Sequence, residues 1–419
     1  MGSWPTIRDL LLLSKQRVTP TGPNLAAFLA PVILSYHIMA VLVQLPRTKL
    51  FRVALLPLVL WLALRAGMSL DFSGKQLEYA YLNKALALVM FNLAMRATTW
   101  TLVNEPYVKV IGHHKARSSN GIANKADSGS FTTSPNNIRS AMLNASDLCN
   151  NLRGLGWNWS KGIYVRSPTF KTESRLVFAV LMLGRSFFYM SICDATDLCV
   201  RALAPQGSTG WSIFDPTLPP IRRYLQSTTI TLLVGFGGIS VLEMYYCLTA
   251  VTCVVLFQQH PSQWPPLFDK PWFATSLARF WNRGWHQLFR ESFVAVGYKP
   301  LEGILGQYAV IGAFLVSGAF HDAGMRGMGH VDTLRIVSYF VMQGAGVGLE
   351  RLWRQLTGRQ VGGCLGCLWV WIWQCLWGHL LVDSWAQGGL IARSAFFPAR
   401  PVSWALSSAG VLRELNSVA

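Results

Sequence analysis

Residues 225–257 read LQSTTITLLVGFGGISVLEMYYCLTAVTCVVLF and form the longest apolar run in the chain. A helix needs about 20 mostly apolar residues to cross the hydrocarbon core of a bilayer. The run is therefore long enough for one long tilted helix, or for two short helices hinged at Gly235, Gly237 and Gly238. Both alternatives predict a protein that is built within a membrane.

Similar apolar runs recur along the chain and set the expected architecture. They lie at residues 24–46, 50–67, 81–102, 175–193, 304–321, 334–350 and 364–385. We therefore expect an all-α fold, a polytopic transmembrane helical bundle of about 8–10 spans. No internal repeat is visible, and residues 1–419 are expected to form a single membrane-embedded domain.

The composition narrows the class of protein. The 419 residues are 52% hydrophobic and only 13% charged, whereas soluble domains are about 25% charged. This argues against a soluble enzyme, a disordered chain and a secreted disulfide scaffold. A net charge of +18 could suggest a nucleic-acid partner. Basic loops that face an anionic cytoplasmic leaflet explain the charge better in so apolar a chain, so we expect a lipid bilayer and no nucleic acid as partner.

The long polar stretch 104–174 predicts the orientation in the membrane. Its excess of basic over acidic residues places it in the cytosol, and its Ser/Asn/Gly-rich part 113–140 is expected to be flexible. If 225–257 is a single span, the loop 258–303 faces the cytosol as well. At the N-terminus, MGSWPTIRDLLLLSKQR predicts an interfacial helix, and Gly2 fits a myristoylation pattern loosely.

Two predicted spans carry a charged residue each, Arg185 and Glu243. An unpaired charge within a bilayer is expensive, so we expect the two side chains to form an ion pair across adjacent helices. The alternative is that they line a polar tunnel for a substrate. Cys364 and Cys367 have metal-ligand spacing but lie in an apolar run without partners, which indicates helix packing and no metal site.

The segment 264–300, WPPLFDKPWFATSLARFWNRGWHQLFRESFVAVGYKP, combines aromatic and basic residues. Trp281, Trp285 and Phe289 are spaced by four, which predicts one face of a helix, with Arg279, Arg283 and Arg290 on other faces. Such a helix suits a membrane surface, where tryptophan anchors and arginine meets headgroups or an anionic ligand. An interfacial helix without any chemistry would explain the same composition.

A single histidine, His321, ends the apolar stretch AVIGAFLVSGAFHDAG. A histidine in such a place is often a core residue with its hydrogen bonds satisfied. Within a membrane, however, ionisable groups are costly and usually functional. His321 is therefore a candidate catalytic residue.

Several of these elements together resemble the membrane-bound O-acyltransferases, in particular the wax-synthase-like branch found in fungi. The resemblance is carried, in order along the chain, by RGLGW at 153–157, WPPLF at 264–268, SLARFWNRGWHQ at 276–287, GYKP at 297–300 and SGAFH at 317–321. The motif-bearing region extends over 264–350. His286 stands where plant relatives carry asparagine, and Asp322 where the family often has glutamate.

The resemblance implies an enzyme that moves an acyl group from acyl-CoA, most often acetyl-CoA in this branch, to a hydroxyl of a lipophilic alcohol such as a terpenoid. It implies that His321, the family's invariant histidine, is the base, while His286 or Asn282 donates to the oxyanion or orients His321. The CoA site would face the cytosol, in the endoplasmic reticulum. Its expected contacts are Arg279, Arg283, Arg290, Lys299, Trp281 and Trp285.

Two alternatives remain open at this point. A long-chain wax ester synthase would use the same chemistry on a fatty alcohol. A transporter or channel would be a protein of a different class. It would require broken spans in two repeats and several charges along one pore, and the sequence shows no repeat. The sequence does not indicate the acceptor or the oligomeric state.

Overall fold

The computed structural model of the protein describes residues 17–74, 76–111, 132–133, 137–160, 164–167, 170, 172–204, 210–391 and 399–408. Three expectations fall outside this part of the chain. They are the interfacial helix at residues 1–16, the modification of Gly2, and the flexibility of most of 113–140.

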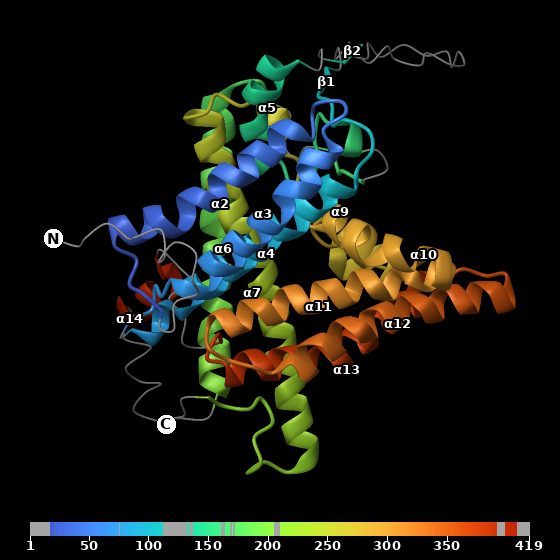
Figure 1. Ribbon diagram of the computed structural model, residues 1–419. Coiled ribbons are helices and arrows are strands. Elements are labelled where there is room, and N and C mark those ends of the chain that lie inside the picture. The colour runs from blue at the N-terminus through green and yellow to red at the C-terminus, as the bar shows by residue number, and fades with distance from the viewer. Residues whose placement is uncertain are drawn as a thin grey trace.

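Long helices dominate the fold (Figure 1). They are α2 (Gly22–Leu42), α3 (Lys49–Ser69), α4 (Ala80–Leu102), α6 (Arg175–Leu203), α7 (Pro220–Val255), α11 (Val310–Gly327), α12 (Thr333–Thr357) and α13 (Gly363–Gln387). The shorter helices are α5 (Ile138–Asn150), α8 (Leu277–Arg279), α9 (Arg290–Phe293), α10 (Lys299–Leu305) and α14 (Pro401–Ser408). Two-residue strands, β1 (Val110–Ile111) and β2 (Thr132–Thr133), form one antiparallel pair. A helix satisfies its own backbone hydrogen bonds, so a helical fold leaves no backbone group of this apolar chain unpaired in lipid.

Seven segments of the described chain are long and apolar enough to span a membrane. They comprise α2, α3, α4, α6, α7, α13 and the continuous stretch Arg290–Gly327, which ends in α11. The protein is therefore a multi-pass membrane protein, as predicted. The expected eighth span, at 334–350, is not among the seven, and this corrects the prediction. The segment does form helix α12, but polar residues such as Gln343 and Glu350 lower its mean hydropathy.

The apolar run 225–257 forms a single helix and not a hinged pair. All of it up to Val255 lies within α7, whose 36 residues give a length of about 54 Å, well beyond the roughly 30 Å of a hydrocarbon core. Helices α6 and α7 lie side by side along most of their length (Figure 1). A Cβ atom on Gly237 would lie 3.1 Å from Oγ1 of Thr196 in α6, so the glycine permits close helix contact and does not act as a hinge.

The C-terminal helices α11, α12 and α13 pack on one another and cross the α6–α7 pair (Figure 1). The core between them contains Leu277, Phe314, Ile336, Phe340 and Trp373. Helix α4 packs against α11 from the other side, and so joins the N-terminal helices α2 and α3 to this core. The motif segment 264–300 is held between these groups of helices.

Candidate active site

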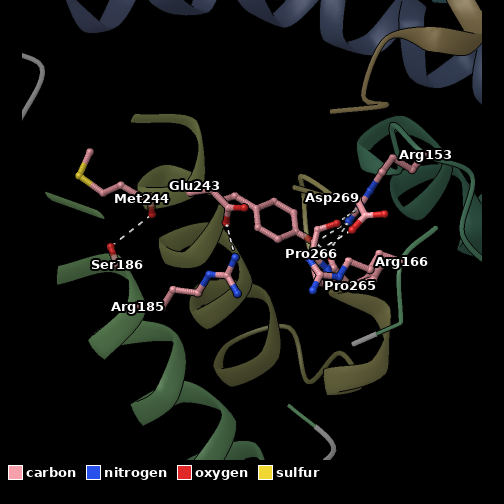
Figure 2. A network of polar contacts seen from close by, with 10 residues as sticks. Arg153, Arg166, Arg185, Ser186, Glu243, Met244, Pro265, Pro266 and Asp269 are labelled. Atoms are coloured by element: carbon pink, nitrogen blue, oxygen red, sulfur yellow. Dashed lines mark hydrogen bonds and ion pairs between the residues drawn. The ribbon is translucent and has the colours of Figure 1, made fainter. Parts of the chain in front are cut away.

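The RGLGW motif holds the WPPLF motif in place. The Arg153 guanidinium donates to the carbonyl oxygens of Pro265 and Pro266, at 3.0 Å each, and also to the hydroxyl of Tyr246 (Figure 2). The chain reaches this position through Gly154, whose φ of +66° favours glycine and where a Cβ atom would lie 2.7 Å from the Trp159 ring. The two motifs, more than a hundred residues apart, therefore form one unit.

An intramembrane ion pair lies on the other side of this unit. Nη2 of Arg185 in α6 is 3.1 Å from Oε2 of Glu243 in α7 (Figure 2). This confirms the pairing that the sequence predicts. The backbone N–H of Phe268 donates to the same carboxylate, so the pair also anchors the WPPLF motif. A small cavity beside the pair is lined mainly by apolar side chains, among them Phe178 and Met182.

The predicted helix through Trp281, Trp285 and Phe289 is broken in the structure, which corrects the expectation of one continuous amphipathic face. Helix α8 has three residues, a π-helical turn follows at Phe280–Gly284, and Trp285 is extended. The break is stable because buried side chains supply the missing hydrogen bonds. The Gln287 amide donates to the carbonyls of Trp281 at 2.9 Å and Trp285 at 2.8 Å.

A buried carboxylate fixes the start of this broken segment. Glu350 in α12 accepts hydrogen bonds from the backbone N–H groups of Leu277 and Ala278, and from the indole N–H of Trp369 at 2.9 Å. A carboxylate at the first turn of a helix satisfies amides that have no partner within the helix. Glu350 therefore positions the FWNRGWH motif, a role that the motif sequence alone does not reveal.

The residues expected to contact CoA separate into two groups. Arg279, Arg283 and Lys299 are exposed, and Arg290 is half-buried. By contrast, the two tryptophans lie in a packed aromatic cluster. The indole of Trp281 donates to Gln343 at 3.2 Å, and Trp285 stacks on Phe280 with ring centroids 5.5 Å apart. The exposed cations remain candidates for phosphate contacts, whereas the tryptophans hold the segment together.

His321 and His286 lie on a common chain of aromatic rings. His321 contacts Phe320 at 5.4 Å between ring centroids, Phe320 contacts Phe289 at 4.9 Å, and Phe289 contacts His286 at 5.7 Å. On its other side His321 stacks on Phe340 of α12, at 4.7 Å and 14°. The fold thus brings the two motif histidines to one apolar region.

The hydrogen bonding of both histidines is incomplete. The Nδ1 atoms of His286 and His321 are buried and have no hydrogen-bond partner in the described part of the chain. A buried polar atom without a partner is costly in a folded protein and needs an explanation. A substrate hydroxyl or carbonyl would supply the missing partner, so these two atoms mark where a reaction could occur.

His286 is electrically neutral at neutral pH. Burial lowers its pKa to about 4, and the positive charge of Arg153 acts in the same direction. A neutral imidazole carries one N–H donor and one acceptor. His286 can therefore donate a hydrogen bond to an oxyanion without first binding a proton.

The other polar candidates form no hydrogen bond with these histidines in the described part of the chain. Asn282 is exposed and makes no side-chain hydrogen bond within the described residues. Asp322, which follows His321, forms an ion pair with Arg326 at 2.7 Å and accepts from Thr333 at 3.1 Å. It therefore stabilises the end of α11. Across the described residues no group of three or more His, Cys, Asp or Glu side chains is arranged to hold a metal ion.

One cation near the histidines was not anticipated from the sequence. Lys84 of α4 places its Nζ 4.4 Å from the centroid of the Trp385 ring, and that ring is 6.3 Å from the His321 ring. A lysine within a predicted span is itself a functional signal.

Comparison with known proteins agrees with the motifs. Residues 264–342 match the "Membrane bound O-acyl transferase family". Acetyltransferase ple2 of Rhodocybe pseudopiperita is 28% identical over 260 residues, which cover 58% of this chain and 62% of that protein. Acetyltransferase ataH of Aspergillus terreus is 31% identical over 174 residues, or 36% of this chain and 57% of that protein.

A plant protein is also similar. The long-chain-alcohol O-fatty-acyltransferase of Simmondsia chinensis is 25% identical over 116 residues, which cover 24% of this chain and 33% of that protein. The chain thus spans roughly a third to three-fifths of the length of these relatives. The match at 264–342 contains the WPPLF, FWNRGWH, GYKP and SGAFH motifs and both candidate histidines. Residues 264–342 thus carry, in order, motifs that match the membrane bound O-acyl transferase family, within a helical membrane fold.

Proposed function

We propose that the protein is an O-acyltransferase that moves an acetyl group from acetyl-CoA to a hydroxyl of a lipophilic alcohol, with His321 as the base. The observation that carries the proposal is a pair of buried Nδ1 atoms, on His321 and His286, that find no hydrogen-bond partner among the described residues and lie within one apolar aromatic region. Apolar walls suit a lipophilic acceptor. The buried nitrogens suit the proton transfer that acylation requires.

The reaction follows from the chemistry of the two groups. The imidazole of His321 takes the proton of the acceptor hydroxyl as its oxygen attacks the thioester carbonyl carbon. A carbon–oxygen bond forms, and the carbonyl electrons move onto the oxygen, where the N–H of His286 stabilises them. The carbonyl then re-forms, the carbon–sulfur bond breaks, and the CoA thiolate takes back the proton from His321. General base catalysis of this kind contributes about 10²–10⁴-fold.

The donor is proposed from charge and from the relatives. Arg279, Arg283 and Lys299 are exposed cations on or next to the motif segment, suited to the CoA phosphates. The basic stretch 104–174 supports a cytosolic position for that side of the protein, where acyl-CoA is found. Two relatives carry the name acetyltransferase, which favours acetyl-CoA over longer donors. The endoplasmic reticulum is the membrane we propose.

Product analysis tests the proposal directly. Membranes from cells that express the protein are incubated with labelled acetyl-CoA and a panel of terpenoid alcohols, and the extracted esters are identified by mass. We expect an acetate ester with the wild type, and a loss of about 10²-fold or more with His321→Ala at equal protein level. His321→Asn should be inactive as well, because an amide cannot accept the proton.

Variants of the second histidine and a control complete the test. His286→Asn should keep substantial activity, because it keeps a donor, whereas His286→Ala should lose much of it. The control is His330→Ala, since its imidazole is 3.5 Å from the Ser384 hydroxyl and is not part of the ring chain. A fully active His321→Ala protein would overturn the mechanism.

The second candidate is a wax ester synthase, which the similarity to the Simmondsia chinensis enzyme favours. It would use the same two histidines with palmitoyl-CoA and a fatty alcohol. The same membranes, supplied with those substrates, distinguish the two candidates.

A further inference from the structure

Lys84 is an intramembrane lysine for which the described residues supply no acidic partner. It lies near the start of α4, a predicted span. Its described contact is the face of the Trp385 ring, and no ion pair links it to an acid among the described residues. A charge in this setting is costly and usually functional. The other cation of the same span, Arg96, instead donates to the carbonyls of Leu148 at 2.7 Å and Asn151 at 3.2 Å.

The side chain of Lys84 lies on the His321 side of α11. A Cβ atom on Gly324 would be 3.1 Å from Cγ of Lys84, so the lysine stem packs directly on that glycine. Residues three apart on a helix share a face, which places the stem on the same face as His321. The stem then leads to the ring of Trp385. The centroid of that ring is 6.3 Å from the centroid of the His321 ring.

We propose that Lys84 is a further catalytic residue, whose ammonium stabilises the oxyanion that forms on the acyl group beside His321. The proposal rests on the proposed function. The carbonyl electrons move onto oxygen as the acceptor oxygen bonds to carbon, and Lys84 neutralises that negative charge without giving up its own proton. The charge returns to the carbonyl as the carbon–sulfur bond breaks, and the thiolate recovers its proton from His321. The described residues offer the lysine no anion at rest, and the oxyanion of the reaction would supply one transiently.

The substitution Lys84→Met separates this role from a structural one. Methionine keeps the stem on Gly324 and the contact with Trp385, and it removes an uncompensated charge, so the thermal midpoint should stay the same or rise. Loss of one oxyanion donor typically costs about 10²–10³-fold in kcat. We expect that loss in kcat, with the KM for acetyl-CoA nearly unchanged. Lys84→Arg, which keeps the charge, should retain more activity than Lys84→Met.

The experiment uses the purified full-length protein in detergent, with kcat, KM and thermal midpoint measured for each variant. Arg96→Met is the matched control: it should lower the thermal midpoint, because its carbonyl partners are left without a donor, and keep kcat per folded molecule. His321→Ala is measured alongside. If His321→Ala is active, the proposed function fails, whatever Lys84 does.

Three results would overturn the role of Lys84 while the proposed function stands. One is a wild-type kcat in Lys84→Met beside an inactive His321→Ala. Another is a change confined to the KM for acetyl-CoA, which would make Lys84 a donor-binding residue. The last is failure of both Lys84→Met and Lys84→Gln to fold, because the argument predicts that a neutral side chain is tolerated there.

Discussion

Replacing Glu243 with leucine should destabilise the protein much more than an apolar replacement of both partners of its ion pair. The Arg185 and Glu243 side chains are 20% and 3% exposed, with their charged atoms 3.1 Å apart. At an effective dielectric constant of about 20, this separation corresponds to an attraction of about 5 kcal/mol before desolvation is subtracted. Removing one partner of such a pair typically costs about 3–5 kcal/mol, since the other charge stays buried.

The double variant Arg185→Met/Glu243→Leu buries no charge, so its free energy of unfolding should lie close to that of the wild type. The coupling energy in a double-mutant cycle is then the sum of the two single-variant costs, so we expect at least about 3 kcal/mol. The free energies come from unfolding in mixed detergent micelles, followed by tryptophan fluorescence. A matched pair on the same two helices, Leu183→Ala and Thr229→Ser, has exposed side chains and should be additive. A coupling energy below about 0.5 kcal/mol would refute the reasoning, because the two charges would then not stabilise each other.

The remaining predictions concern orientation, donor length and the packing of the motifs. The sequons at Asn144 and Asn158 should both stay unglycosylated if stretch 104–174 faces the cytosol, and a glycosidase-sensitive mass shift on either asparagine would reverse the orientation. Turnover should fall steeply from acetyl-CoA to palmitoyl-CoA in the ester assay, and equal turnover would favour the wax ester candidate. Gly297→Ala should cost about 1–3 kcal/mol of stability, because its Cβ would overlap the Gly312 carbonyl, whereas Gly303→Ala, with open space around it, is the control. Arg153→Lys should lower kcat while the protein still accumulates, because a lysine cannot reproduce the planar guanidinium that donates to two proline carbonyls. An unchanged kcat would contradict this role of Arg153.

Much of the fold was predictable because a membrane helix is a local structure. Each span forms its backbone hydrogen bonds within itself. The length and hydropathy of an apolar run are therefore enough to predict that it becomes a helix. The sequence also offered the pairing of Arg185 with Glu243 as one of two hypotheses, because an isolated charge is expensive in lipid, and the structure shows the pair. Periodicity was a poorer guide in 277–293. There the spacing of Trp281 and Trp285 fits a helix, but hydrogen bonds from Gln287 and Glu350 stabilise a break instead.

The sequence by itself determined that the chain is a helical membrane protein, which family motifs it carries, and that His321 and His286 are its candidate catalytic groups. Only the tertiary structure decided that 225–257 is one helix, that Arg153 joins two distant motifs, and that Glu350 positions the segment that bears His286. It also brought Lys84, from the other end of the chain, to the face of α11 that carries His321. The physical reason is that hydropathy and helix formation depend on neighbours along the chain. A buried polar contact depends instead on which helices pack together, and no local pattern encodes that.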